Sequence, residues 1–176
     1  MPVADEFLAA NERYAASFTK GNLPTPPARK VAVVVCMDAR IDPARALGLE
    51  EGDAHVIRNA GGRVTEDVLR SLVISQQLLG TREVVVVHHT DCGMLTFSNQ
   101  DIRAKLRQEL GPEAARVAET IDFLPFSDLE ESVRQDVEAI RRSPLIVKDI
   151  PITGFIYDVH TGRLQKVVEG RTAQAA

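Results

Sequence analysis

The sequence lacks the features by which secreted, membrane-bound and disulfide-rich proteins are usually recognised. It has two cysteines, Cys36 and Cys92, among 176 residues, which is too few for a disulfide framework. No apolar run approaches the length of a membrane span, and the first seven residues carry two acids instead of the apolar core of a signal peptide. We therefore expect a cytoplasmic protein with no membrane partner, in which the cysteines serve as ligands, catalytic groups or core residues.

An excess of positive charge is also absent. The 21 basic and 25 acidic residues leave a net charge of −4, so the chain offers no basic surface of the kind that binds nucleic acid. We expect a small-molecule substrate as the partner instead. With 44% hydrophobic residues and no internal repeat, the chain is long enough for one domain with a single core.

The chain divides into an arm, a domain and a tail. Ala4 to Phe18 spaces its apolar residues in a loosely helical manner and predicts an amphipathic helix. Residues 21–27, Gly-Asn-Leu-Pro-Thr-Pro-Pro, cannot continue that helix, since each proline fixes φ and removes a hydrogen-bond donor. We expect an N-terminal arm and linker over residues 1–27, a single domain over residues 28–170, and a polar tail over residues 171–176.

Two unbroken apolar runs, Val31 to Val35 and Val84 to Val87, have the composition of strands that are buried on both faces. Such strands occur in parallel sheets, so we predict an α/β fold with a mainly parallel sheet of four or five strands and helices on both faces. Each run ends abruptly at residues that can bind a metal ion. Because the carboxyl ends of neighbouring parallel strands share an edge, this fold would bring Cys36 close to His89 and Cys92.

The residues after these strands have the spacing of a metal site. His89-x-x-Cys92 lets an imidazole and a thiolate reach one ion from a single loop, and Cys36 is the candidate for the third ligand that zinc requires. Asp38 and Arg40 would share a side if the first strand continued, close enough for a charge-assisted pair. Taken separately, the same residues also fit buried core cysteines, a loop histidine and a surface salt bridge.

Together the two strand ends resemble the β-class carbonic anhydrases, whose patterns are Cys-x-Asp-x-Arg and His-x-x-Cys-Gly. The resemblance covers about residues 31–159 and is greatest to the short actinobacterial-type members. It implies one zinc ion per chain, three protein ligands and an open fourth coordination position. It also implies homodimers, or tetramers built from such dimers, in which N-terminal arms embrace the partner. The matching residues are Cys36, Asp38, Arg40, His89, Cys92 and Gly93.

The activity that the resemblance implies is that of a carbonate dehydratase, a zinc lyase that uses zinc-activated water to hydrate carbon dioxide reversibly to bicarbonate and a proton. Two thiolates cancel the charge of zinc, so this site should acidify its water less than a three-histidine site does. Asp38, held by Arg40, would compensate by accepting a hydrogen bond and orienting the attacking oxygen. Because Asp38 lies two residues from a ligand, we also expect a closed state in which its carboxylate becomes the fourth zinc ligand.

The segment Asn59-Ala-Gly-Gly62 follows a short predicted strand over residues 54–58. Adjacent glycines before a helix can present N–H groups to an anion, although a simple tight turn fits the pattern equally well. In the resembling family a similar segment borders the zinc cleft, so Gly61, Gly62 and the flexible Gly93 are expected to form substrate-cleft backbone. The other predicted elements are helices from the cap Thr65 to Gly80, over 101–110, over 113–120 and over 128–142 with a capping box from Ser127, and strands over 152–159 and 164–168.

Two departures from the family pattern concern the substrate. Ala39 stands where many members have serine, and no glutamine occurs among residues 27–35. Relatives with the same zinc site hydrolyse carbonyl sulfide or carbon disulfide, so a hydrolase of that type is the alternative. A third interpretation is a non-catalytic protein in which Asp38 permanently completes a structural zinc site. His88 should point away from its neighbour His89, and we assign no histidine as a proton shuttle.

Overall fold

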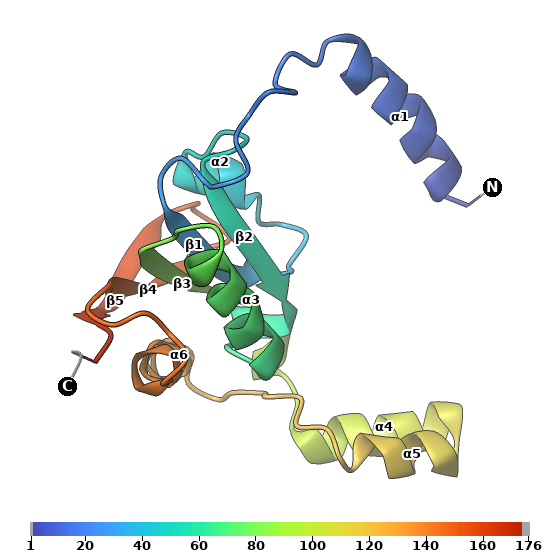
Figure 1. The fold of residues 1–176 in the computed structure, drawn as a ribbon. Helices are drawn as coiled ribbons and strands as arrows, with labels where there is room; N and C mark the ends of the chain where they lie inside the picture. Colours follow the sequence, from blue (N-terminus) through green and yellow to red (C-terminus); the bar gives the residue numbers. More distant parts are fainter. Residues whose placement is uncertain (1, 174–176) are drawn as a thin grey trace.

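The computed structural model describes residues 2–173 (Figure 1). Over that range the chain forms one five-stranded sheet with the order β2-β1-β3-β4-β5. The first four strands run parallel, and β5 pairs antiparallel with β4. The predicted α/β fold with a mainly parallel sheet is confirmed. The strands are β1 (Val31–Cys36), β2 (Ala54–Asn59), β3 (Glu83–His89), β4 (Pro151–Tyr157) and β5 (Leu164–Arg171).

The predicted helices are present, with bounds that differ by a few residues, whereas the short helix Pro43–Leu47 was not predicted. Asp128, rather than Ser127, caps the helix that ends at Arg142, because the Asp128 side chain accepts a hydrogen bond from the Glu131 N–H. Another helix begins two residues earlier than predicted, after Ser98, whose side chain forms a capping box with Asp101. The helices are α1 (Ala4–Ala16), α2 (Pro43–Leu47), α3 (Glu66–Gln77), α4 (Asn99–Leu110), α5 (Pro112–Ala118) and α6 (Leu129–Arg142), with 3₁₀ turns η1 (Ala60–Gly62) and η2 (Gly93–Leu95).

The two faces of the sheet are covered differently. The helices α3 and α6 both lie on one face, where α3 packs on β1 and β2 and α6 packs on β3, β4 and β5. Alternate residues of β1, among them Ala32 and Val34, belong to the core on this face. The helix α6 packs closely on Gly154 of β4, since a Cβ atom there would lie 2.5 Å from the Val133 side chain. The opposite face, with Val33 and Val87, is covered by the segments around the short α2 and η2. The long helices therefore do not flank both faces equally.

The strand order places the candidate residues at one edge of the sheet. The chain passes through α2 between β1 and β2, and through α3 between β2 and β3, so β3 returns to the free side of β1. In open α/β sheets the crevice at such a reversal of strand order is where ligands bind. The ends of β1 and β3, at Cys36 and His89, meet at that point.

The N-terminal arm extends away from the sheet, and the α4–α5 hairpin extends from the other end of the molecule (Figure 1). None of the residues of α1 is buried against another part of the described chain. Near its end the Tyr14 hydroxyl donates a 2.8 Å hydrogen bond to Glu51, and Lys20 pairs with Glu50 and Glu51. No helix within residues 2–173 is long and apolar enough to cross a membrane.

Candidate metal centre

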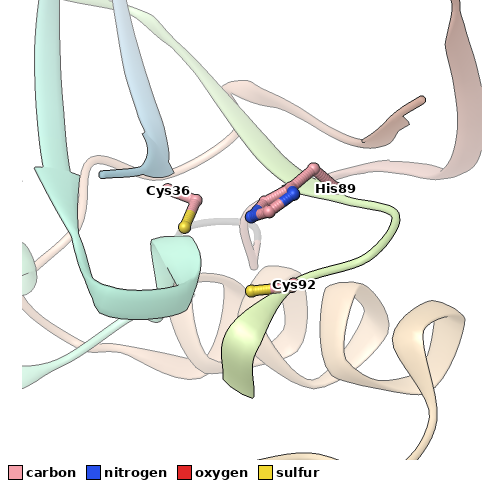
Figure 2. A group of neighbouring side chains, drawn as sticks. All are labelled: Cys36, His89 and Cys92. Carbon is pink, nitrogen blue, oxygen red and sulfur yellow. The ribbon is translucent and has the colours of Figure 1, made fainter. Parts of the chain in front are cut away.

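Three side chains from two strand ends point toward one centre (Figure 2). Cys36 is the last residue of β1, His89 is the last residue of β3, and Cys92 lies directly before η2. Their ligand atoms all lie within 4.8 Å of one another, and all three residues are buried. Two thiolates and one imidazole at this spacing form a donor set that zinc binds in tetrahedral sites with an open fourth position.

The imidazole of His89 is oriented for metal binding. Its Nδ1 lies 2.8 Å from the Thr90 carbonyl oxygen, to which it can donate, so the lone pair is left on Nε2. That Nε2 atom is buried and has no hydrogen-bond partner within residues 2–173. A buried nitrogen without a partner is costly, and a metal ion bound with Cys36 and Cys92 would satisfy it. The residues therefore fit a zinc ion on their own chemistry.

The Cys36 and Cys92 thiols lie close enough to change each other's pKa. The neighbouring Cys92 thiol, by hydrogen bonding, lowers the pKa of Cys36 to about 4, although burial opposes this change. The same hydrogen bond raises the pKa of Cys92, because a second thiolate beside Cys36 is unfavourable. A dication between the sulfur atoms would stabilise both thiolates.

Asp38 and Arg40 form the predicted charge-assisted pair, although the strand does not continue to them. The strand β1 ends at Cys36, and Asp38 instead accepts a 2.8 Å hydrogen bond from the Arg40 backbone N–H in a local turn. The guanidinium of Arg40 adds two bonds to the carboxylate, of 3.0 and 2.8 Å. These bonds lower the pKa of Asp38, whose Oδ2 lies 3.7 Å from the Nε2 of His89.

Two further residues that the sequence interpretation missed hold this turn in place. Arg58, near the end of β2, donates from Nε to the Cys36 carbonyl at 3.0 Å and from Nη2 to the Asp38 carbonyl at 2.8 Å. Asp91 accepts a 2.7 Å hydrogen bond from Arg40. The signal for Asp91 is its place inside the His89-to-Cys92 loop, whereas nothing in the local sequence around Arg58 indicates its partners.

A cavity of about 310 Å³ is lined in part by Cys36, His89 and Cys92. Gly61 and Gly93 line it, as predicted for cleft backbone, whereas Gly62 is not among its lining residues. Gly62 lies against the strands instead: its φ is +65°, and a Cβ atom there would lie 2.8 Å from the Cys36 nitrogen. The apolar part of the lining consists of Met37, Ala60, Met94 and Phe97.

The other three histidines lie away from the ligand group. His88 points to the α6 face, as predicted, where its ring nitrogens lie 2.7 Å from Ser132 Oγ and 3.0 Å from Asp136 Oδ2. His55 is hydrogen bonded to Ser75 at 2.7 Å, and His160 is exposed. None of them faces the cavity among the described residues.

Comparisons with known proteins agree with this geometry. A family model described as carbonic anhydrase matches residues 31–164. Beta-carbonic anhydrase 1 of Mycobacterium tuberculosis is 49% identical over 167 residues, which cover 95% of this chain and 99% of that protein. This chain belongs to the β-class carbonic anhydrase family. The resemblance predicted from the two motifs is thereby confirmed.

The family fold is also shared over nearly the whole chain. The solved structure of a carbonic anhydrase from Glaciozyma antarctica has a TM-score of 0.90 and 50% identity, and the match covers 96% of this chain and 100% of that one. A relative named carbon disulfide hydrolase, from an Acidianus species, is 38% identical over 181 residues, covering 92% of this chain and 87% of that protein. Relatives of this β-class chain thus have two kinds of name, carbonic anhydrase and carbon disulfide hydrolase.

Proposed function

We propose that this chain catalyses the reversible hydration of carbon dioxide to bicarbonate and a proton, with one zinc ion bound by Cys36, His89 and Cys92. The observation that carries this proposal is the buried Nε2 of His89, which has no partner in the described chain and lies 3.7 Å from the Asp38 carboxylate. Membership of the carbonic anhydrase family supports the same reaction. The expected cytoplasmic location suits two reduced cysteines.

Zinc, when bound, would supply a Lewis acid that acidifies a water molecule. The protein contributes orientation. Arg40 holds the pKa of Asp38 below its ordinary range, so at neutral pH the carboxylate is an acceptor and can take a hydrogen bond from the attacking oxygen. The apolar side chains of Met94 and Phe97 limit water in the cavity and suit an uncharged, linear substrate. The backbone of Gly61 and Gly93 leaves space for it.

The test is stopped-flow carbon dioxide hydration at pH about 7 and about 8.5, on protein of measured zinc content, beside a Cys92→Ala variant. We expect zinc-dependent hydration that increases with pH and is lost in the variant. Full zinc occupancy without hydration at either pH would contradict the proposal and favour a structural zinc site. The bonds from Arg40 to Asp38 speak against that third interpretation, since they occupy the carboxylate that a structural site would need.

The second candidate is a hydrolase of carbonyl sulfide or carbon disulfide that uses the same ligands. It is favoured by the relative named carbon disulfide hydrolase, whose match covers 92% of this chain. Both substrates are linear triatomic molecules, so the lining of the cavity would decide between them and carbon dioxide. Carbonyl sulfide hydrolysis measured on the same sample separates the two reactions: strong hydrolysis with weak hydration would reassign the enzyme.

We also propose that two copies associate through their N-terminal arms, as a homodimer or within a tetramer built from such dimers. The exposed apolar side chains of the arm favour such an association: Phe7 is 65% exposed and Leu8 is 72% exposed. The surface that we propose for the partner's arm is a cavity of about 190 Å³ on the sheet face opposite α3, whose lining includes Val33 and Leu47. Light scattering of the unaltered chain and of Leu8→Asp tests the association, and a monomer in the unaltered chain would contradict it.

A further inference from the structure

The guanidinium of Arg40 lies between two aspartates. On one side it donates to Asp38, from Nε to Oδ1 at 3.0 Å and from Nη2 to Oδ2 at 2.8 Å. On the other side its Nη1 donates to Asp91 Oδ2 at 2.7 Å, and its Nη2 donates to the Asp91 carbonyl at 2.9 Å. Asp91 therefore fixes the side of the guanidinium that Asp38 leaves free.

The backbone at Asp91 is well anchored. Its φ of +53° lies in the left-handed region, which aspartate and asparagine tolerate better than most residues. The preceding Thr90 donates its N–H to the Tyr157 carbonyl at 2.9 Å and accepts the Val159 N–H on its hydroxyl at 3.1 Å. Contacts with the end of β4 thus hold the loop, so Asp91 presents its carboxylate and carbonyl to Arg40 from a fixed position.

This anchor affects the metal centre through Asp38. The Asp38 Oδ2 atom lies only 3.7 Å from the Nε2 of His89, within reach of an ion held by that nitrogen. What keeps the carboxylate turned toward Arg40 is the guanidinium and the Arg40 backbone N–H. The side chain of Arg40 is 46% exposed. An exposed arginine that pairs with one carboxylate gains little free energy, because ordering its side chain costs entropy, so the second partner Asp91 helps to hold Arg40 on Asp38.

We propose that Asp91 is a positioning residue: by holding Arg40 on Asp38, it keeps the Asp38 carboxylate out of the metal centre. The inference rests on the zinc site of the proposed function. Asp91 itself touches no ligand atom in this role, and it acts through Arg40. Without the Asp91 carboxylate, Arg40 gains rotamer freedom and Asp38 turns toward the ion as a fourth protein ligand.

The experiment replaces Asp91 with asparagine, which tolerates the left-handed conformation and keeps the backbone carbonyl but removes the charge. We expect zinc loss to a chelator to become slower by about threefold to tenfold, because a fourth protein ligand is added, and kcat for hydration to fall by a similar factor. A crystal structure of the zinc-loaded variant should show Asp38 at the metal. The matched control is Asp67→Asn, which removes an exposed aspartate that pairs with Arg70 at 2.8 Å on α3.

A double variant isolates the route of the effect. In an Asp38→Asn background, Asp91→Asn should no longer slow zinc loss, since the displaced carboxylate is absent. Unchanged zinc release in Asp91→Asn, or an equal change in both backgrounds, would overturn the inference. Zinc release and the crystal structure can be measured whether or not the protein hydrates carbon dioxide. A chain that binds zinc but does not hydrate carbon dioxide would therefore refute the proposed reaction, and zinc release would still decide the role of Asp91.

Discussion

His88 and His89 are neighbours in one strand, and both side chains are fully buried, yet their surroundings differ. Both ring nitrogens of His88 have partners, Ser132 and Asp136, on the α6 face. Within residues 2–173, His89 has one hydrogen-bond partner, the Thr90 carbonyl, and its other nitrogen lies near two cysteines. A buried histidine with both nitrogens satisfied has no capacity left for a ligand, so hydrogen-bond saturation separates a structural histidine from a metal ligand.

Buried polar residues on the sheet face covered by α6 lie behind Cys36, His89 and Cys92 and hold the strands that carry them. Asp136 pairs with His88 at 3.0 Å and with Arg63 at 2.9 Å, and all three residues are buried. The Phe126 ring stacks on His88 with centroids 5.6 Å apart, and the Arg63 guanidinium lies 5.4 Å from the same ring. Arg63 directly follows Gly62, so this network joins η1 to β3 and α6 behind the ligands.

The largest expected effect comes from removing the ligand histidine. His89→Ala should lose zinc and lower hydration by at least about a hundredfold, because two thiolates without the imidazole hold the ion poorly. The stability of the metal-free protein should change far less, since the side chain satisfies only one hydrogen bond there. Metal analysis and stopped-flow rates measure the first effect. Retained zinc at unaltered occupancy would contradict the ligand assignment.

Removing the neighbouring histidine should do the reverse. His88→Ala leaves Ser132 without its ring contact and Asp136 with one partner fewer in a buried site, and it opens a cavity. We expect a loss of about 3–5 kcal/mol in the free energy of unfolding, or ~10 °C in melting temperature, with zinc still bound at low temperature. Thermal unfolding and metal analysis check this. If His88→Ala lost zinc at a temperature where it remained folded, the contrast between the two histidines would fail.

Gly62 tests the connection between the two faces. A Cβ atom there would lie 2.8 Å from the Cys36 nitrogen and 3.0 Å from the Val87 carbonyl oxygen, and backbone atoms cannot move aside easily. With the added strain of a φ of +65°, Gly62→Ala should cost about 2–3 kcal/mol of stability and weaken zinc binding.

The control for that substitution is Gly93→Ala. Gly93 also lines the cavity beside Cys92, but apart from its two chain neighbours no described residue has an atom within 4 Å of the position that a Cβ atom would take there. Its φ is not in the left-handed region. We expect a change of less than about 0.5 kcal/mol. Urea unfolding of both variants gives the comparison, and equal losses would show that crowding at Gly62 is not the cause.

The fold and the clustering of Cys36, His89 and Cys92 could be predicted from the sequence because their signals are local. Valine runs that end at cysteine or histidine identify buried parallel strands, and the parallel edge then brings the ends together. The contacts that fix Arg40 and His88 could not be predicted in this way. Arg40 meets Asp91 across 51 residues, and His88 meets Asp136 across 48 residues, so both pairs depend on how loops and α6 pack. The Asp38–Arg40 pair was predicted correctly, but a turn forms it and not an extended strand.

The smallest expected loss of zinc binding concerns Arg58, whose side chain bonds to the backbone carbonyls of Cys36 and Asp38. Its fork holds the carbonyls of Cys36 and Asp38 from the neighbouring strand, a geometry that the single ammonium group of lysine cannot reproduce. Arg58→Lys should therefore weaken zinc binding by about tenfold, the usual size of an effect from outside the ligand shell, and change stability by less than about 1 kcal/mol. Competition with a chelator measures the zinc affinity, with Arg70→Lys on the exposed surface of α3 as the control. Unchanged affinity would contradict this prediction. It would mean that β1 and the turn after it hold Cys36 without Arg58, and that only the network of His88, Asp136 and Arg63 supports the metal centre.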